Sequence, residues 1–458
     1  MGKLWQKNYD LDSLVEKFTV GLDFRLDQHL LNADCVASLA HATMLESIGI
    51  LTTEELTALK KGLVEIIQAG QTGSFPIRQA DEDGHTAIEN YLTAQTGDAG
   101  KKIHTGRSRN DQVIVATRLY ARGFLLVFMK NGLELVKNLL TFAEEYKQVP
   151  MAGRTHMQIA MPSSVGLWAG AYAEQILDDL LLVRTAYVIN NQSPLGSAAS
   201  YGVPLPLNRE LVAELLGFAK VQNNVLYANN SRGKMESIIL DAVEQVTLTL
   251  SKLAQDLILF SMPEFKYFTL PDNLCSGSSI MPQKKNPCAL ELLRAKASTI
   301  AACSLQIKNI IKALPSGYNR DFQETKEPFM RGINTGLSCV KIMDLAVRKV
   351  KVNEEYLRAG LIPEIYATDA AIELVAQGIP FRDAYKEIGL HLDKLKARDP
   401  DEAILKKTHT GATGNLGLDK AIQAREKLQQ YVEAEETAIE EKVKHLVGLE
   451  VELFSPEW

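Results

Sequence analysis

The sequence of 458 residues predicts an all-α protein whose centre is a bundle of long helices. Two observations predict this class. Several long tracts contain no proline, and such tracts permit long helices because proline interrupts a helix interior. Strand signals are few, since strict alternation of polar and apolar residues is rare and no Asn-Gly or Asp-Gly turn lies between β-branched runs.

The two ends of the chain differ from its centre. Residues 1–109 contain shorter amphipathic patterns, which predict helices over 34–48 and 53–69. Residues 356–458 are also expected to form short helices, because prolines and a glycine-rich turn interrupt them. The sequence therefore predicts three domains, of which the central one comprises residues 110–355.

The central part carries the longest helical patterns. The first predicted helix runs over 111–146, with Gly123 and Gly132 as weak points because glycine destabilises a helix interior. Two more are predicted over 164–190 and 234–262. In the last of these, apolar residues recur at alternating spacings of four and three, which is typical of a helix about 40 Å long packed at a shallow angle against others. Helices of this length expose more apolar surface than one chain covers, so a homo-oligomer is expected.

The composition excludes several classes of protein. With 50 basic and 56 acidic side chains, the chain has no basic field to hold nucleic acid or an anionic membrane. Its five cysteines include no C-x-x-C pair and no cluster at zinc spacing, which predicts free thiols and no structural metal. The uninterrupted apolar runs are too short to cross a bilayer, and the N-terminus lacks the apolar core of a signal peptide. A soluble cytoplasmic protein is expected.

The most unusual polar segment is the loop GSSIMPQKKNP at 277–287. Asn286 and Pro287 predict a helix start, with Asn286 as the N-cap and Pro287 in the first helical position. Together with two lysines, the free N–H groups of such a start favour an anion such as a carboxylate. A solvated surface turn is the alternative interpretation. The sequence contains no P-loop, dinucleotide-binding, α/β-hydrolase or common zinc-protease motif.

Three further polar segments interrupt the helical pattern: HTGRSRNDQ at 104–112, GRTHMQ at 153–158 and YNRDFQETK at 318–326. The arginines of the first of these segments could hold carboxylates in a bidentate manner. Each segment alone is also consistent with a solvated turn, and a lone histidine such as His156 is more often structural than catalytic. Together, within a helical bundle, the segments predict anion-binding loops at helix ends and a small ligand with several carboxylates.

The loop GSSIMPQKKNP resembles the signature of the fumarase/aspartase superfamily, whose members eliminate fumarate from succinyl compounds. HTGRSRNDQV and the ending QKKNP resemble the argininosuccinate lyase family in particular. The similarity covers most of the chain, through GKLW, VEKF, DEDGH, THMQ, YNRDFQETK and PFRDAY. It implies a three-domain helical fold, and a homotetramer whose active sites are shared among three subunits. The implied reaction is the reversible elimination of fumarate from argininosuccinate to give arginine, in arginine biosynthesis or the urea cycle, with no metal or organic cofactor.

The resemblance also implies roles for individual residues. Ser278 would be the base that removes a proton beside a carboxylate, and Lys284 would stabilise both its alkoxide and the doubly charged aci-carboxylate intermediate. His156 would help the guanidine to leave, directly or through another group, with Glu291 as its acidic partner. The residues expected to bind the substrate are Asn110, Arg109, Thr155, Asn286, Tyr318, Gln323, Lys326, His85 and Gly21.

Three positions depart from the family pattern. Gly21 stands where a serine that touches the substrate is usual, Gly84 replaces an aliphatic residue, and Arg154 replaces a tyrosine. None of these changes removes a proposed chemical group. Two alternatives remain. One is a lyase acting on another succinyl-amine, which the segment HTGRSRND disfavours. The other is a structural protein of the same fold, as in the lens crystallins, which the presence of all the expected catalytic groups disfavours.

Overall fold

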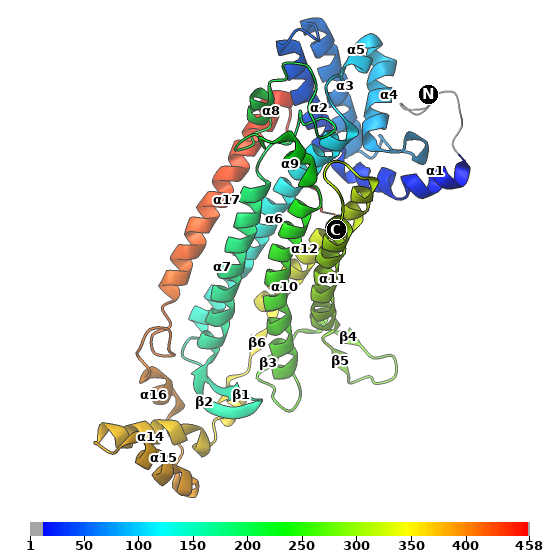
Figure 1. The fold of residues 1–458 in the computed structure, drawn as a ribbon. Coiled ribbons are helices and arrows are strands. Elements are labelled where there is room, and N and C mark those ends of the chain that lie inside the picture. The colour runs from blue at the N-terminus through cyan, green and yellow to red at the C-terminus, as the bar shows by residue number, and fades with distance from the viewer. Residues whose placement is uncertain (1–11, 457–458) are drawn as a thin grey trace.

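The computed structural model describes residues 12–456, and the GKLW stretch lies outside them. The chain forms an elongated, mainly helical molecule around a central bundle (Figure 1), which confirms the predicted helical class. The long bundle helices are α6 (Arg109–Glu145), α7 (Val165–Asn190), α10 (Lys234–Phe260), α11 (Cys288–Ile311) and α12 (Lys326–Lys349). The short helices α8 (Arg209–Leu215) and α9 (Val225–Asn230) lie in the connection between α7 and α10.

Helix α6 continues without a break through Gly123 and Gly132, so neither glycine is a weak point. Both are sites of close packing. A Cβ atom on Gly123 would lie 2.9 Å from the Cβ of Phe454, and one on Gly132 would lie 2.8 Å from a methyl group of Leu180. Within residues 12–456, α6 is the one helix long and apolar enough to span a membrane, but 89% of its apolar window is buried inside the protein. Its apolar surface therefore belongs to the core.

The N-terminal part packs against one end of the bundle. Its helices are α1 (Ser13–Val20), α2 (Asp23–Ser47), α3 (Thr53–Gln71), α4 (Gly84–Thr96) and α5 (Asp98–Lys102). The predicted helices over 34–48 and 53–69 correspond to α2 and α3, but α2 begins earlier. Helix α3 starts at a capping box, in which Thr52 and Glu55 each accept a hydrogen bond from the other's backbone N–H.

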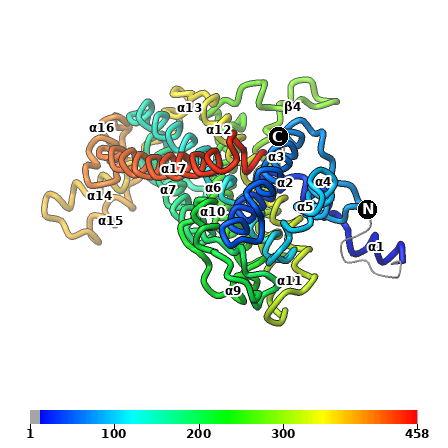
Figure 2. The backbone as a smooth tube through the Cα atoms, turned by 90° about the horizontal axis from the view of Figure 1, so that it is seen from above, coloured from blue at the N-terminus to red at the C-terminus, as the bar shows by residue number. Residues whose placement is uncertain are grey.

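The C-terminal part contains one helix that the sequence analysis missed. Its helices are α13 (Glu354–Ala359), α14 (Ala367–Ala376), α15 (Phe381–Leu390), α16 (Pro400–Leu405) and α17 (Leu418–Val447). The expectation of short helices alone is wrong, because α17 has 30 residues. It lies between Gly417 and Gly448, which both have positive φ, and contains neither glycine nor proline. Helix α17 returns along the bundle against α6 and α7 (Figure 2), where Lys130 forms an ion pair with Glu436.

Three small antiparallel ladders lie at the ends of the helices. Strands β1 (Pro150–Thr155) and β2 (Gln158–Ser164) form a hairpin, β3 (Phe268–Thr269) pairs with β6 (Lys351–Val352), and β4 (Ser276–Gly277) pairs with β5 (Lys285–Asn286). The β1–β2 hairpin turns at His156 and Met157, whose φ values are +52° and +64°. No sequence signal indicated this hairpin, because glycine or asparagine usually occupies such positions.

The packing at Gly123 gives a test of the bundle. In Gly123→Ala, the new methyl group would press on the backbone and Cβ of Phe454, and we expect the free energy of unfolding to fall by about 1–3 kcal/mol. Urea denaturation measures this change. The matched control is Gly389→Ala, in the exposed helix α15, where a Cβ would meet nothing within 4 Å. The control should gain up to about 1 kcal/mol from helix propensity. Equal effects in the two variants would contradict close packing at Gly123.

Candidate active site

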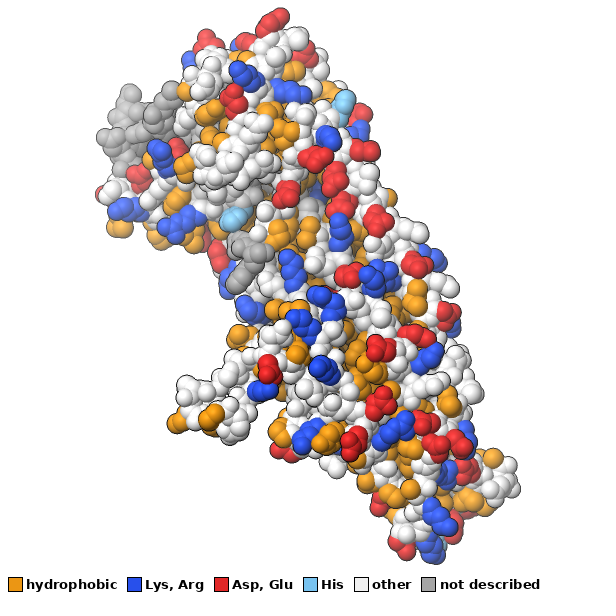
Figure 3. Space-filling view, turned by 180° about the vertical axis from the view of Figure 1, so that it is seen from behind, with side chains coloured by type: hydrophobic (Ala, Val, Ile, Leu, Met, Phe, Trp, Pro, Cys, Tyr) orange, Lys and Arg blue, Asp and Glu red, His pale blue; other side chains and the backbone are white. Residues whose placement is uncertain are grey.

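The loop with the proposed base forms an arm that projects from the bundle (Figures 1 and 3). Strands β4 and β5 form its stem, and residues 279–285 are all exposed. The Oγ of Ser278 accepts a hydrogen bond from the N–H of Met281 at 3.0 Å and a longer one from that of Ile280 at 3.4 Å. Lys284 lies on the same arm, so the structure places these two predicted catalytic residues on one short loop.

Asn286 is not the N-cap of α11, contrary to the sequence prediction. It pairs with Ser276 in the β4–β5 ladder, and its Nδ2 donates a hydrogen bond to the carbonyl of Gly277 at 3.4 Å. Pro287 is the residue that precedes the helix, and Cys288 takes the first helical position. Pairing with the opposite strand thus holds Asn286 in an extended conformation.

The hairpin between β1 and β2 presents Thr155 and His156 at its exposed tip. Arg154 stabilises this tip through two contacts. Its Nη1 donates to the carbonyl of Met157 at 3.2 Å, and its guanidinium carbon lies 4.9 Å from the ring centre of Phe265. The arginine that departs from the family pattern therefore closes the turn that holds His156.

The N-terminus of α6 carries Arg109 and Asn110. Ser108 caps this helix, and Asp111 accepts a hydrogen bond from the Ser108 N–H at 2.9 Å. Burial raises the pKa of Asp111, although several backbone N–H groups bond to its carboxylate. Arg109 donates to Thr86 Oγ1 at 2.9 Å, and its Nη1 lies 3.2 Å from Asp83. These contacts fix the direction of the arginine before any ligand binds.

His85 lies buried at the start of α4. Its Nδ1 is 2.5 Å from Oδ2 of Asp34. Burial alone would lower the pKa of His85, but the carboxylate of Asp34, with Asp83 and Asp27, outweighs burial and raises the pKa. The neighbouring Gly84 donates its N–H to Asp27 at 2.9 Å, and a Cβ on Gly84 would lie 3.3 Å from the Cβ of Asp27. The second departure from the family pattern thus permits close contact with α2.

Lys326 is buried at the start of α12 between two carboxylates. Its Nζ lies 2.9 Å from Asp23 and 2.5 Å from Asp27. Burial disfavours the ammonium form, but Asp27 and Asp23 outweigh burial and raise the pKa of Lys326. Lys326 therefore holds the N-terminal part against the bundle as a charged group.

Gly21 and Gln323 lie beside this charge cluster. Gly21 has φ +54° and ψ −127°, a conformation that serine adopts only with strain, and a Cβ there would lie 3.9 Å from Nε2 of Gln323. Gln323 donates from Nε2 to the carbonyl of Thr19 at 3.0 Å. Tyr318 is exposed and follows Gly317, whose N–H bonds to Asn230. The backbone conformation at position 21 therefore favours glycine over serine in this chain.

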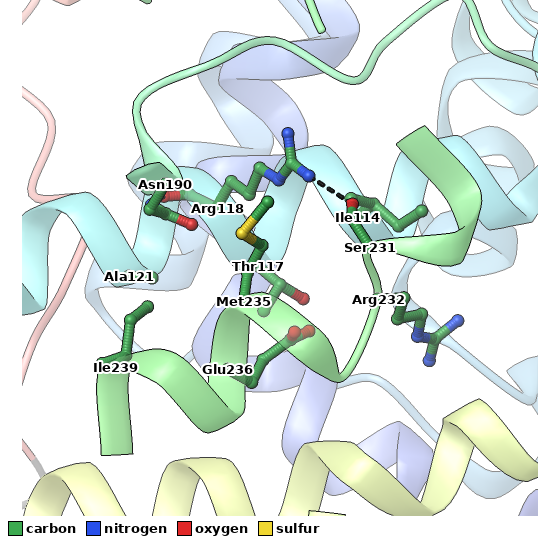
Figure 4. Close-up of a pocket in the computed structure, with 10 residues that line it drawn as sticks. All are labelled: Ile114, Thr117, Arg118, Ala121, Asn190, Ser231, Arg232, Met235, Glu236 and Ile239. Carbon is green, nitrogen blue, oxygen red and sulfur yellow. Dashed lines mark hydrogen bonds between the residues drawn. The ribbon is translucent and has the colours of Figure 1, made fainter. Parts of the chain in front are cut away.

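A small cavity lies between α6, the end of α7 and the start of α10 (Figure 4). Its volume is about 10 Å³, which accommodates at most one water molecule. Arg118 and Glu236 line it; burial lowers the pKa of Arg118 to about 10 and raises that of Glu236. Arg232 lines the cavity too, with its guanidinium carbon 6.0 Å from the ring centre of Tyr318. Of these buried charged groups, Arg232 thus lies beneath the exposed ring of Tyr318.

The predicted residues lie in separate places within one chain. Helix α6 has 37 residues and is therefore about 55 Å long. Asn110 lies at its first turn, whereas the hairpin with His156 follows its last turn (Figure 1). Among residues 12–456, the side chains of His156 and Glu291 take part in no hydrogen bond or ion pair. The single chain brings together Gly21, His85, Arg109, Asn110, Gln323 and Lys326, but not the proposed catalytic groups with them.

The buried acids that hold the predicted cations were not predicted from the sequence. Asp23 and Asp27 hold Lys326, and Asp34 contacts His85. The spacing of four residues between Asp23 and Asp27 could have signalled a shared helix face. No pattern could have identified their partner, because Lys326 lies some three hundred residues further along the chain.

Comparison with known proteins finds relatives over nearly the whole chain. The sequence pattern of a family described as "Lyase" matches residues 7–302. The argininosuccinate lyase of Parabacteroides distasonis is 45% identical over 416 residues, which are 90% of this chain and 92% of the relative. A solved structure of an EDDS lyase variant with bound fumarate has a TM-score of 0.80 at 22% identity, over 98% of this chain and 96% of the other. The class II fumarase of Schistosoma mansoni has a TM-score of 0.73 at 17% identity, over 89% and 97%.

The chain therefore shares its fold with these two solved structures, and the matching family pattern makes the protein a lyase. The sequence identity to the relatives defines the family of the protein more narrowly. The chain belongs to the argininosuccinate lyase family, whose members are carbon–nitrogen lyases. This result confirms the resemblance found in HTGRSRNDQV and GSSIMPQKKNP.

The raised pKa of His85 predicts how stability depends on pH. Because the folded pKa is raised above the ordinary value of 6.5, the stabilisation is fully present below that pH and disappears as pH rises through the folded pKa. Thermal midpoints of the wild type and His85→Gln should therefore differ more at about pH 6 than at about pH 9. His445→Gln, at an exposed position of α17, is the control and should show no such trend. A difference that is equal at both pH values would contradict a charged His85–Asp34 pair.

Proposed function

We propose that the protein catalyses the reversible elimination of fumarate from argininosuccinate to give arginine, in arginine biosynthesis or the urea cycle, without a metal or organic cofactor. The identity to argininosuccinate lyases over 90% of the chain supports this substrate. The observation that carries the mechanism is the environment of Ser278. Its Oγ already accepts hydrogen bonds from two backbone N–H groups of its own loop.

Ser278 is the proposed base. A serine hydroxyl is a very weak acid, so its alkoxide needs stabilisation before it can take a proton from carbon. Hydrogen bonds to the charged form favour that form, and the N–H groups of Ile280 and Met281 supply them. The ammonium of Lys284 on the same arm adds a positive charge. Removal of the proton beside the carboxylate then gives a doubly charged aci-carboxylate, which Lys284 and Asn286 would stabilise.

The carbon–nitrogen bond breaks in the second step. Arginine would leave as a strongly basic neutral guanidine unless it receives a proton, so a general acid lowers the barrier. His156, at the exposed tip of the β1–β2 hairpin, is the proposed group, either directly or through another residue, with Glu291 as its partner. Thr155, Asn110 and Arg109 would hold the substrate carboxylates.

We further propose a homotetramer in which three subunits contribute to each active site. The separation of Asn110 from His156 along α6 supports this arrangement, because a small substrate cannot bridge the length of that helix. Exposed apolar side chains on the bundle also support it, since such surfaces usually mark contacts between proteins. They are Leu181, Leu182 and Val188 on α7, Leu248 on α10, and Leu292 and Leu305 on α11.

We propose three domains, with residues 1–109 and 356–458 flanking the bundle domain of 110–355. In this division α17 would be a C-terminal element that packs back on the bundle. We also propose that the protein is cytoplasmic and binds neither nucleic acid nor membranes, in keeping with its net charge of −6.

The proposed base gives a direct test of the reaction. Purified protein should release fumarate from argininosuccinate, measured by ultraviolet absorbance. Ser278→Ala should lower the turnover rate by about 10³-fold or more, because it removes an essential acid–base group.

The matched control is Ser279→Ala, which removes the adjacent hydroxyl of the same arm. This control should keep most of the activity. Near-normal turnover by Ser278→Ala would remove Ser278 from the mechanism. Turnover of adenylosuccinate without turnover of argininosuccinate would contradict the proposed substrate.

A shared site predicts complementation between inactive variants. His156→Ala and Ser278→Ala should each be nearly inactive, whereas tetramers that contain both should regain part of the wild-type activity. Activity returns because some sites receive the intact His156 from one subunit and the intact Ser278 from another. Native mass spectrometry would verify that subunits have mixed. Complete inactivity of verified mixed tetramers would contradict a site shared in this way.

A further inference from the structure

Asp23 occupies the outer position in the charge cluster of Asp23, Asp27 and Lys326. Its Oδ1 lies 2.9 Å from Nζ of Lys326. The side chains of Lys326 and Asp27 are only 2% and 4% exposed, whereas that of Asp23 is 16% exposed. Within this cluster, Asp23 therefore provides the carboxylate that a ligand can reach.

The inner members of the cluster are already engaged. Lys326 contacts both carboxylates, and the second oxygen of Asp27 accepts the N–H of Gly84 at 2.9 Å. By contrast, Oδ2 of Asp23 has no hydrogen bond or ion pair within the described residues 12–456. The charges of His85 and Arg232 also act on the carboxylates of this cluster. His85, however, lies close to Asp34, and Arg232 lies close to Glu236.

The neighbours of Asp23 are residues that the resemblance assigns to substrate binding, and none of them is a proposed catalytic group. Gly21 precedes it by two positions and lies against Gln323. Tyr318 lies over Arg232, whose charge acts on Asp23. The amino-acid end of argininosuccinate carries an α-ammonium and an α-carboxylate. An ammonium group needs an anionic or neutral acceptor, and Gly21 has no side chain to offer one.

We infer that Asp23 determines specificity for the amino-acid end of the substrate, with Oδ2 receiving its α-ammonium group. This inference rests on the proposed function and deepens it. Lys326 orients the Asp23 carboxylate through Oδ1 and leaves Oδ2 directed at the ligand. The charge-assisted bond distinguishes an amino acid from an analogue that lacks only the amino group, because loss of that partner leaves the carboxylate unpaired in a partly buried site.

The reverse reaction tests this assignment. Fumarate is supplied with arginine or with 5-guanidinopentanoate, which has the same guanidine and carboxylate but no α-amino group, and loss of fumarate absorbance is followed. The wild type should prefer arginine in kcat/KM by about 10- to 100-fold, the range of one hydrogen bond to a charged group. Asp23→Asn should reduce that preference to less than about 3-fold, mainly through a higher KM for arginine.

Two further variants serve as controls for this experiment. Asp23→Glu keeps the charge and should retain part of the preference, which a purely structural role would not predict. The matched control Asp98→Asn removes a carboxylate from an exposed position of α5, where it pairs with Lys101, and should leave the preference unchanged. Asp23→Asn keeps an oxygen that can accept from Lys326, so folding is expected to persist.

The possible failures are distinguishable. Equal use of arginine and 5-guanidinopentanoate by the wild type would overturn the role of Asp23, whether or not any variant folds. An unchanged preference in a folded Asp23→Asn would do the same. If the wild type processes argininosuccinate in neither direction, the proposed function itself is wrong. If the wild type processes argininosuccinate normally but shows no preference for arginine, or if the folded Asp23→Asn variant keeps that preference, the inference is wrong and the proposed function stands.

Discussion

Helix α6 separates the residues predicted to bind substrate at its first turn from the hairpin after its last turn, and it runs unbroken over its 37 residues, with both of its glycines packed against neighbouring side chains. A helix of this length cannot bend its ends toward one substrate. The residues predicted for the site therefore do not meet within one copy of the chain. Exposed leucines on α7, α10 and α11 offer a physical reason for copies to associate. In this view the long helix is the constraint that makes catalysis depend on assembly.

The recognition end of the molecule is organised by buried ion pairs. Arg109, Lys326 and His85 each contact at least one carboxylate. Burying charges in this way is costly and gives little net stability. Its benefit is orientation: each group has a fixed position before the substrate arrives, so little reorganisation is needed on binding. The pairing also means that Asp23 and Asp27 already engage the ammonium group of Lys326.

Local physical rules determined how much of the structure the sequence could predict. Proline-free tracts in which apolar residues recur every three or four positions predicted the long helices, because helix formation depends mainly on nearby residues. The hairpin was missed because His156 and Met157 adopt positive φ without the usual turn residues. The prediction of Asn286 as an N-cap was wrong because Ser276, on the opposite strand, holds Asn286 in an extended conformation. Contacts between distant segments, such as those of Lys326 with α2, have no local signal at all.

The two ends of the proposed site are built in opposite ways, and the chemistry explains the difference. Recognition of fixed charges favours a buried, preorganised cluster, as at Lys326. The proposed base, Ser278, instead lies on an exposed arm, where in the proposed tetramer another subunit would complete the site. Its stabilising N–H donors, Ile280 and Met281, belong to the same turn and accompany it in any displacement of the arm. The proposed activation of Ser278 would therefore be local to the loop, whereas the proposed recognition would depend on the fold of the whole bundle.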